Sequence, residues 1–245
     1  MMNKTVTLKT TGIDLIDNKW GGFYNGSTYI VNGPSKSGRT TLALQYAYNA
    51  ALQGEVTLYF TEIRPRKLIV AAHAQGMEIQ PLIDENKLII LRTAPLRMEE
   101  NGQDRDSLLS EFLYDLLNAV NEFNPSNIIF DELTPYMDFN DKDLFVDVFT
   151  EIIESLEDML ITSIFIIQDQ SDSDNASLQK QLQNIATGNI QLDKRISNSN
   201  VTKPNNRMRV VSDFDRCDQA TYFPNNYDET ASTSINQEIK IASVA

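Results

Sequence analysis

Residues 27–42 read STYIVNGPSKSGRTTL, and the order of residue types in this stretch predicts a loop that binds phosphate. β-prone apolar residues lead into Gly33, four residues separate it from Gly38, and a cation and two threonines then open a helical pattern. A strand, a glycine-bearing loop and a helix N-terminus in this order can cradle phosphates. The loop N–H groups point inward, and the helix dipole adds partial positive charge at the same place.

The template for such a loop is GxxxxGK[ST], in which the lysine reaches the β- and γ-phosphates and the hydroxyl ligates Mg²⁺. The chain fits this template at every position except the lysine, which is Arg39. A glycine-rich turn without a ligand is the alternative, but the position between a predicted strand and a predicted helix favours phosphate binding. The residues expected to contact phosphate are Gly33, Pro34, Ser35, Lys36, Ser37, Gly38, Arg39, Thr40 and Thr41.

The composition is that of a globular protein without membrane spans. With 245 residues, 41% of them hydrophobic, the chain can build one large α/β domain or two small ones. No apolar run is long enough to span a membrane, and the N-terminus lacks the apolar core of a signal peptide. The single cysteine, Cys217, excludes an intrachain disulfide, so a cytoplasmic location is expected. The single histidine, His73, is interpreted as a packing residue within a helix.

The charge of the chain is acidic and unevenly distributed. The formal net charge is −13, which argues against a protein that coats a nucleic-acid backbone, because neutralising phosphates requires clustered Lys and Arg. Residues 104–160 hold fifteen Asp or Glu and only two Lys or Arg. A solvated helical face is the simpler interpretation of this segment, and an acidic docking surface for a protein partner is the alternative.

Predicted strands and helices alternate along the chain. Strands are expected at 29–31, 56–62, 87–92, 126–133, 161–170, 189–194, 207–212 and 220–223. Helices are expected at 40–53, 65–75, 107–124 and 143–160, with a polar helix or loop at 172–186, a lead-in at 5–26 and a loop at 96–105. This alternation predicts an α/β fold with a mainly parallel central sheet and helices on both faces. Residues 1–223 are expected to form this domain, and the polar residues 224–245 a flexible tail.

Polar residues end several of the expected strands. The carboxyl ends of parallel strands hold the ligands of such sheets, so these residues are candidates for the site. Asp131 ends an apolar strand and is expected to hold Mg²⁺ with Thr40, because hard oxygen ligands suit that ion. Glu62 could orient an attacking water and Gln168 could sense a γ-phosphate through its amide. Simple solvation of a strand end is the alternative for both Glu62 and Gln168.

The order of these motifs resembles the KaiC-like branch of the RecA-type P-loop ATPases over residues 11–211. The lead-in TGIDLIDNKWGGFYNGSTYIVNGP, the helix TTLALQYAYNAA and the stretch AAHAQGMEIQPLIDENKLIILRTAP are similar to the corresponding segments of that family. The resemblance implies a RecA-like fold that binds ATP with Mg²⁺ between neighbouring subunits of a homo-oligomeric ring, commonly a hexamer. It also implies that Glu62 is the catalytic carboxylate.

The chain departs from the family pattern at three places. The usual lysine is Arg39, and the usual pair of acids after the second core strand is Thr61-Glu62, with one acid. The family's C-terminal cations, which reach the neighbouring subunit's γ-phosphate, fall in the segment RVVSDFDRCDQ, where only Arg216 could substitute. Loss of a cation of this kind can cost roughly 10³ to 10⁵ in rate, so reduced turnover is expected while phosphate binding survives. Lys36 is a second candidate to supply the missing charge in the loop.

Three functions are therefore weighed. The leading hypothesis is a slow Mg²⁺-dependent ATPase that acts as a ring-forming regulatory or signalling module. The second is a pseudo-ATPase that binds nucleotide only to assemble or to engage a partner. The third is a DNA recombinase, which shares the fold but which the acidic charge disfavours.

Overall fold

A computed structural model describes residues 6–93, 104–169, 173–195, 205–213 and 221–222. The strands are β1 (Leu8–Lys9), β2 (Phe23–Tyr24), β3 (Thr28–Gly33), β4 (Thr57–Thr61), β5 (Leu88–Arg92), β6 (Asn127–Asp131), β7 (Thr162–Gln168), β8 (Gly188–Arg195), β9 (Asn205–Asp213) and β10 (Thr221–Tyr222). The helices are α1 (Asp14–Trp20), α2 (Arg39–Leu52), α3 (Pro65–His73), α4 (Gln80–Asp84), α5 (Arg105–Phe123), α6 (Lys142–Asp158) and α7 (Ser173–Ile185), with a 3₁₀ turn η1 (Thr134–Tyr136).

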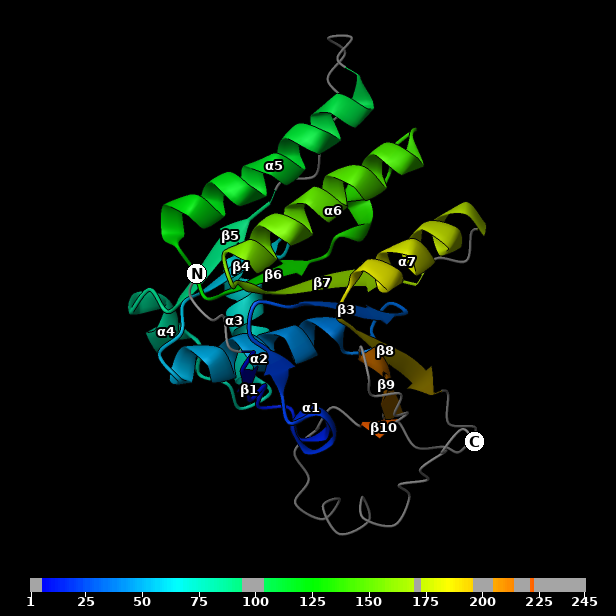
Figure 1. The fold of residues 1–245 in the computed structure, drawn as a ribbon. Helices are drawn as coiled ribbons and strands as arrows, with labels where there is room; N and C mark the ends of the chain where they lie inside the picture. Colours follow the sequence, from blue (N-terminus) through cyan, green and yellow to red (C-terminus); the bar gives the residue numbers. More distant parts are fainter. Residues whose placement is uncertain (1–5, 94–103, 170–172, 196–204, 214–220, 223–245) are drawn as a thin grey trace.

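Eight strands form one sheet in the order β10-β9-β8-β3-β7-β6-β4-β5. The six strands from β8 to β5 run parallel, whereas β9 and β10 each pair antiparallel with their neighbour. Strands β1 and β2 form a separate antiparallel pair. The expected α/β architecture with a mainly parallel sheet is confirmed (Figure 1).

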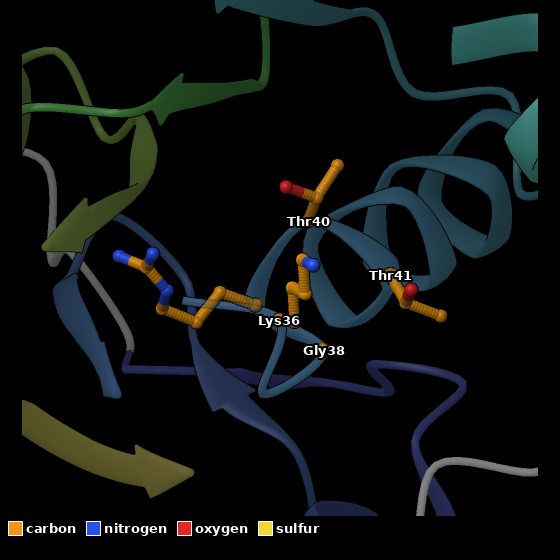
Figure 2. Close-up of a pocket in the computed structure, with 5 residues that line it drawn as sticks. Lys36, Gly38, Thr40 and Thr41 are labelled. Atoms are coloured by element: carbon orange, nitrogen blue, oxygen red, sulfur yellow. The ribbon is translucent and has the colours of Figure 1, made fainter. Parts of the chain in front are cut away.

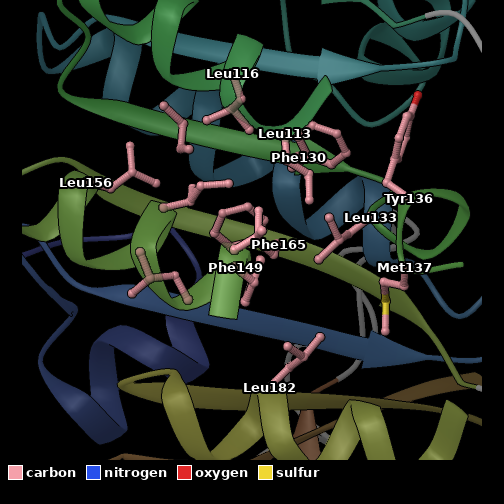
Figure 3. Packing of buried hydrophobic residues seen from close by; sticks show 14 of the residues in the cluster. Leu113, Leu116, Phe130, Leu133, Tyr136, Met137, Phe149, Leu156, Phe165 and Leu182 are labelled. Atoms are coloured by element: carbon pink, nitrogen blue, oxygen red, sulfur yellow. The ribbon is translucent and has the colours of Figure 1, made fainter. Parts of the chain in front are cut away.

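The sheet separates two hydrophobic cores because its strands are apolar on both faces. In β7, Ile164 and Ile166 pack into the core beneath α1–α4, while Phe165 and Ile167 face α5–α7. Alternate strand residues point to opposite faces, so an unbroken apolar run is what a strand covered on both sides requires. Figure 3 shows the second core, where Leu113 and Phe149 from two helices meet the sheet.

Several element boundaries differ from the sequence-based expectations. Residues 14–20, expected as part of an irregular lead-in, form α1, which buries Ile16 and Trp20 against the sheet. Residues Ser173–Ile185, within the polar segment expected as a helix or a loop, form the helix α7, and residues Gln80–Asp84, where no helix was expected, form the short helix α4. Strand β4 ends at Thr61, so Glu62 follows the strand instead of ending it.

The packing role expected for His73 is wrong. Its side chain is 71% exposed at the end of α3, and Nδ1 lies 2.7 Å from Glu78 Oε1. The apolar side of α3 is formed by Leu68 and Ala72, which leaves the next position on the outer surface.

The acidic segment is mostly solvent-facing. Glu111, Asp115, Asp147 and Glu151 are exposed on α5 and α6, which agrees with both a solvated face and a docking surface. Asp106 differs from them: it is buried, and its carboxylate accepts hydrogen bonds from the backbone N–H groups of residues 140 and 141 at 2.7 and 2.9 Å. This carboxylate therefore fixes the start of α6 to α5.

The expected tail 224–245 and most of the expected loop 96–105 lie outside the described residues. Among the helices that the structure does describe, none is long and apolar enough to cross a membrane.

Candidate functional site

The carboxyl ends of four parallel strands bring the candidate residues to one edge of the sheet. Gly33 of β3 is in register with Gln168 of β7, and Thr61 of β4 is in register with Asp131 of β6. The loop that follows β3, the first residue after β4 and the ends of β6 and β7 therefore meet at this edge. Arg216, the candidate for a cation acting on a neighbouring subunit, lies outside the described residues.

The loop after β3 is tightly folded at its glycines. A Cβ atom on Gly33 would come within 2.6 Å of the backbone oxygen of Leu192 and of Ser37 Oγ, so no side chain fits there. Gly38 has a φ of 102°, which favours glycine, and it is the N-cap of α2. This N-cap has no side chain to cover the first N–H groups of the helix. The loop and the helix start thus present backbone donors to an anion.

A pocket of about 280 Å³ opens at the loop and the first turn of α2. Its lining residues are Lys36, Gly38, Arg39, Thr40 and Thr41. Figure 2 shows Lys36 beside the first turn of the helix, from which Thr40 and Thr41 point in different directions. Pockets for whole drug-sized ligands are commonly about 300–1,000 Å³, so this one suits the phosphates of a nucleotide, with the rest of the molecule outside it.

Two buried polar atoms in the loop region find no hydrogen-bond partner among the described residues. They are Ser37 Oγ and Arg39 Nη1. Ser37 is completely buried and Arg39 is 8% exposed. A buried polar group without a hydrogen bond typically costs about 1–3 kcal/mol, so an anion that accepts from these donors would be stabilised.

Asp131 lies between two hydroxyl groups at the end of β6. Thr40 Oγ1 donates to Asp131 Oδ1 at 3.3 Å, and the Tyr59 hydroxyl donates to Oδ2 at 2.8 Å. The Asp131 side chain is nearly inaccessible, and burial raises its pKa to about 6. The hydroxyl and carboxylate are oxygen ligands of the kind that Mg²⁺ prefers, and a cation would offset the cost of the buried carboxylate. Thr40 and Asp131 therefore fit the ion that the motif implies.

Arg39, the residue that departs from the template, lies among the strand ends. Its Nη1 is 3.2 Å from Glu132 Oε1, and Nη2 donates to Gln168 Oε1 at 3.5 Å. Its side chain is 9% exposed and that of Glu132 28%. The planar guanidinium spans two neighbouring strand ends at once, which the compact ammonium of a lysine could not do.

Glu62 is half-buried, and its carboxylate faces the 3₁₀ turn after β6. The Tyr136 hydroxyl donates to Glu62 Oε1 at 3.4 Å, and burial raises the pKa of this tyrosine to about 12. Tyr136 is therefore a protonated donor at neutral pH. The contact orients Glu62 but leaves its second oxygen for another partner.

Four residues around the site were missed in the sequence: Tyr59, Glu132, Thr134 and Tyr136. Glu132 directly follows the expected metal ligand, so adjacency was a usable signal for it. Thr134 links two strand ends, since its hydroxyl donates to Glu132 Oε1 at 2.7 Å and accepts from the Gln168 N–H at 2.8 Å. The described residues contain no cluster of three or more His, Cys, Asp or Glu side chains that could hold a metal by themselves.

The model of the family described as "ATPase: KaiC" matches residues 9–212. The chain belongs to the KaiC ATPase family. A circadian clock oscillator protein KaiC from Picosynechococcus sp. is 32% identical over 131 residues, which is 50% of this chain and 24% of that protein. A circadian clock protein KaiC2 from Synechocystis sp. is 28% identical over 156 residues, or 62% of this chain and 26% of that protein.

A solved structure of a KaiC-like protein from Pyrococcus horikoshii has the same fold. The TM-score is 0.69 at 21% identity, over 89% of this chain and 94% of that one. The chain is thus a KaiC-like P-loop ATPase of the RecA superfamily by family and by fold. The matched region is about a quarter of the length of the two clock proteins, so their whole-protein activities and partners are not carried over.

Proposed function

We propose that this KaiC-like chain binds ATP at the loop 33–41 and hydrolyses it slowly with Mg²⁺, as a regulatory or signalling module that assembles into a ring. The observation that carries the proposal is the hydrogen bond of Thr40 to the buried Asp131, beside a loop and helix N-terminus that line a pocket of about 280 Å³. Family membership supports nucleotide binding. The ring rests on family resemblance alone.

Each residue has a role in this proposal. The N–H groups of the loop and of the first turn of α2 bind phosphate, and Thr40 and Asp131 hold the metal. Glu62, oriented by Tyr136, accepts a proton from the attacking water or positions it. Mg²⁺, when bound, neutralises charge on the β- and γ-phosphates.

Slow turnover follows from the placement of Arg39. Its guanidinium is already engaged with Glu132 and Gln168, so it must rearrange before it can contact a terminal phosphate. Glu62 is the single carboxylate directly after β4, so no second acid beside it helps to position or deprotonate the attacking water. These features weaken the chemical step more than they weaken binding, which draws on many backbone N–H groups.

The decisive measurement is ATP affinity together with steady-state phosphate release. We expect wild type to bind and release phosphate slowly, and Glu62→Gln to bind equally well but to release about a hundredfold less. Glu85→Gln is the matched control, because Glu85 pairs with Lys87 at the opposite, amino end of the strands. Equal release by wild type and Glu62→Gln would remove Glu62 from the catalytic role.

Size-exclusion chromatography with and without ATP and Mg²⁺ tests the assembly. A ring predicts a higher-mass species that nucleotide stabilises, since a ligand that binds only the assembled state favours it by mass action. A monomer under both conditions would contradict the ring.

The pseudo-ATPase is the second candidate, and the ion pair of Arg39 with Glu132 favours it specifically. It predicts retained ATP binding with no phosphate release from wild type. The recombinase is not supported by the charge of −13, and salt-dependent binding to single-stranded DNA would be needed to revive it.

A further inference from the structure

The ion pair of Arg39 and Glu132 belongs to a closed network at the carboxyl edge of the sheet. Glu132 Oε1 lies 3.2 Å from Arg39 Nη1 and also accepts the Thr134 hydroxyl hydrogen at 2.7 Å. Thr134 in turn accepts the Gln168 N–H at 2.8 Å, and the Gln168 side chain accepts from Arg39 Nη2 at 3.5 Å. Four residues thus connect the start of α2 with the ends of β6 and β7.

Two features of this network favour exchange of its central ion pair. Arg39 Nη1 is close to Glu132 but makes no hydrogen bond of good geometry with any described residue, although it is buried. A buried cationic donor that lacks a well-formed hydrogen bond is stabilised when an anion in a better position accepts from it. Arg39 also lines the phosphate pocket, so an anion there can reach it.

We propose that Arg39 and Glu132 form a latch that the third phosphate of a nucleoside triphosphate opens and that a diphosphate leaves closed. This inference rests on the proposed nucleotide binding at the loop 33–41. The loop and helix N–H groups hold the first two phosphates, whereas the guanidinium extends beyond them to the ends of β6 and β7. A terminal phosphate at that point takes Arg39 from Glu132.

Opening the latch has a consequence for the rest of the sheet. Glu132, released from Arg39, is held by Thr134, which also holds the Gln168 N–H where β7 ends. Loss of the contact with Arg39 therefore alters the hydrogen bonds through which Glu132 and Thr134 connect the end of β6 to the end of β7. The ATP state and the ADP state then differ at the strand that leads towards α7, which a signalling module requires.

The first test compares dissociation constants for ADP and for the non-hydrolysable analogue adenylyl imidodiphosphate. Glu132→Gln removes the competing charge at nearly constant shape, so the preference for the triphosphate over ADP is expected to rise about tenfold or more. Thr134→Val, which loosens Glu132 without changing its charge, is expected to shift the ratio in the same direction by less. Glu85→Gln is the control for a lost carboxylate far from the site and is expected to leave the ratio unchanged.

The second test separates release of Arg39 from simple repulsion between Glu132 and the phosphate. Side-chain nitrogen NMR of the ¹⁵N-arginine-labelled 245-residue chain, with Arg39 assigned by Arg39→Lys, follows the guanidinium directly. We expect the Arg39 signal to move when the triphosphate analogue binds and to stay in place when ADP binds. In the nucleotide-free Glu132→Gln variant, the signal should already be shifted towards its position in the triphosphate-bound wild type. Thermal unfolding of each variant checks that it is folded.

An unchanged ratio in both Glu132→Gln and Thr134→Val overturns the latch while nucleotide binding stands. A raised preference for the triphosphate analogue over ADP, combined with an Arg39 NMR signal that the analogue does not move, also overturns the latch and favours simple repulsion between Glu132 and the phosphate. An Arg39 signal that ADP moves as far as the analogue does overturns the latch as well. Binding of neither nucleotide by wild type overturns the latch together with the proposed function.

Discussion

Thr40 Oγ1 lies 3.3 Å from Asp131 Oδ1 and donates a hydrogen bond to it, joining two residues that are 91 positions apart in the chain. Thr40 is in the first turn of α2, and Asp131 is the last residue of β6. The parallel sheet creates this pair, because β7 alone separates β3 from β6 in the strand order and both strands end at the same edge. The pair is the centre of the proposed metal site.

Thr40→Val is expected to remove the Mg²⁺-dependent part of ATP affinity. Valine keeps the shape of threonine but lacks the hydroxyl that would ligate the ion. Titrations of nucleotide in Mg²⁺ and in EDTA measure the effect: wild type should bind at least about tenfold more tightly with the metal, and the variant equally in both. Thr150→Val is the matched control, since the Thr150 hydroxyl bonds within α6. A full Mg²⁺ effect in Thr40→Val would contradict the assignment.

Asp131→Asn is expected to stabilise the nucleotide-free protein at pH 8. Burial raises the pKa of Asp131 from 3.8 to about 6, so the folded state holds its proton more tightly than the unfolded state does. The ionised carboxylate therefore lowers the free energy of unfolding above pH 6, by about 3 kcal/mol when fully developed, and the cost fades as the pH falls from 6 to 4.

Urea unfolding in EDTA at pH 8 and pH 5 measures this difference. The asparagine variant should be more stable than wild type at pH 8, with a smaller advantage at pH 5. Asp115→Asn, on the exposed side of α5, controls for the loss of one negative charge. The same advantage at both pH values would show that titration of Asp131 is not the cause.

Gly33→Ala is expected to weaken both folding and nucleotide binding. The added methyl group would lie 2.6 Å from the backbone oxygen of Leu192 and from Ser37 Oγ, so the loop or β8 must shift, at a cost of about 1–3 kcal/mol. Gly54→Ala is a useful comparison: its φ of 86° is also unfavourable to alanine, but nothing lies within 4 Å of the new methyl group. Gly54→Ala should lower the free energy of unfolding by about 1 kcal/mol and leave nucleotide binding unchanged. Unfolding and nucleotide titrations of both variants check the contrast, and similar binding by the two would refute it.

Arg39→Lys is expected to raise phosphate release several-fold. Lysine matches the loop template, and its ammonium cannot span Glu132 and Gln168 as the guanidinium does. The measurement is steady-state turnover at saturating ATP, with Arg66→Lys on the exposed surface of α3 as the control. A fall in turnover would mean that the site has adapted to arginine and that the contacts of Arg39 with Glu132 and Gln168 are not what slows hydrolysis.

Much of the fold could be predicted because its signals are local. The apolar runs of β3, β6 and β7 and the spacing of apolar residues in α5 and α6 stand in contiguous segments, so periodicity identified them. The short helices α1 and α4 were missed, because seven and five residues carry too little periodicity to be distinguished from a turn. The exposure of His73 was missed for a related reason: one position decides whether a helical residue faces the core or the solvent.

The pattern of residues 33–41 predicted a phosphate loop, the alternation of strands and helices predicted a mainly parallel sheet, and Asp131 at the end of an apolar strand predicted a carboxylate facing the loop hydroxyl. Each of these depends on local order or on the common edge where parallel strands end. The surroundings of Arg39 could not be predicted in this way. The sequence identified Arg39 as a departure from the template, but its partners are Glu132, directly after β6, and Gln168, at the end of β7. The direction of a buried guanidinium depends on which anions and amides the packed sheet brings within reach, and that is a property of the assembled fold.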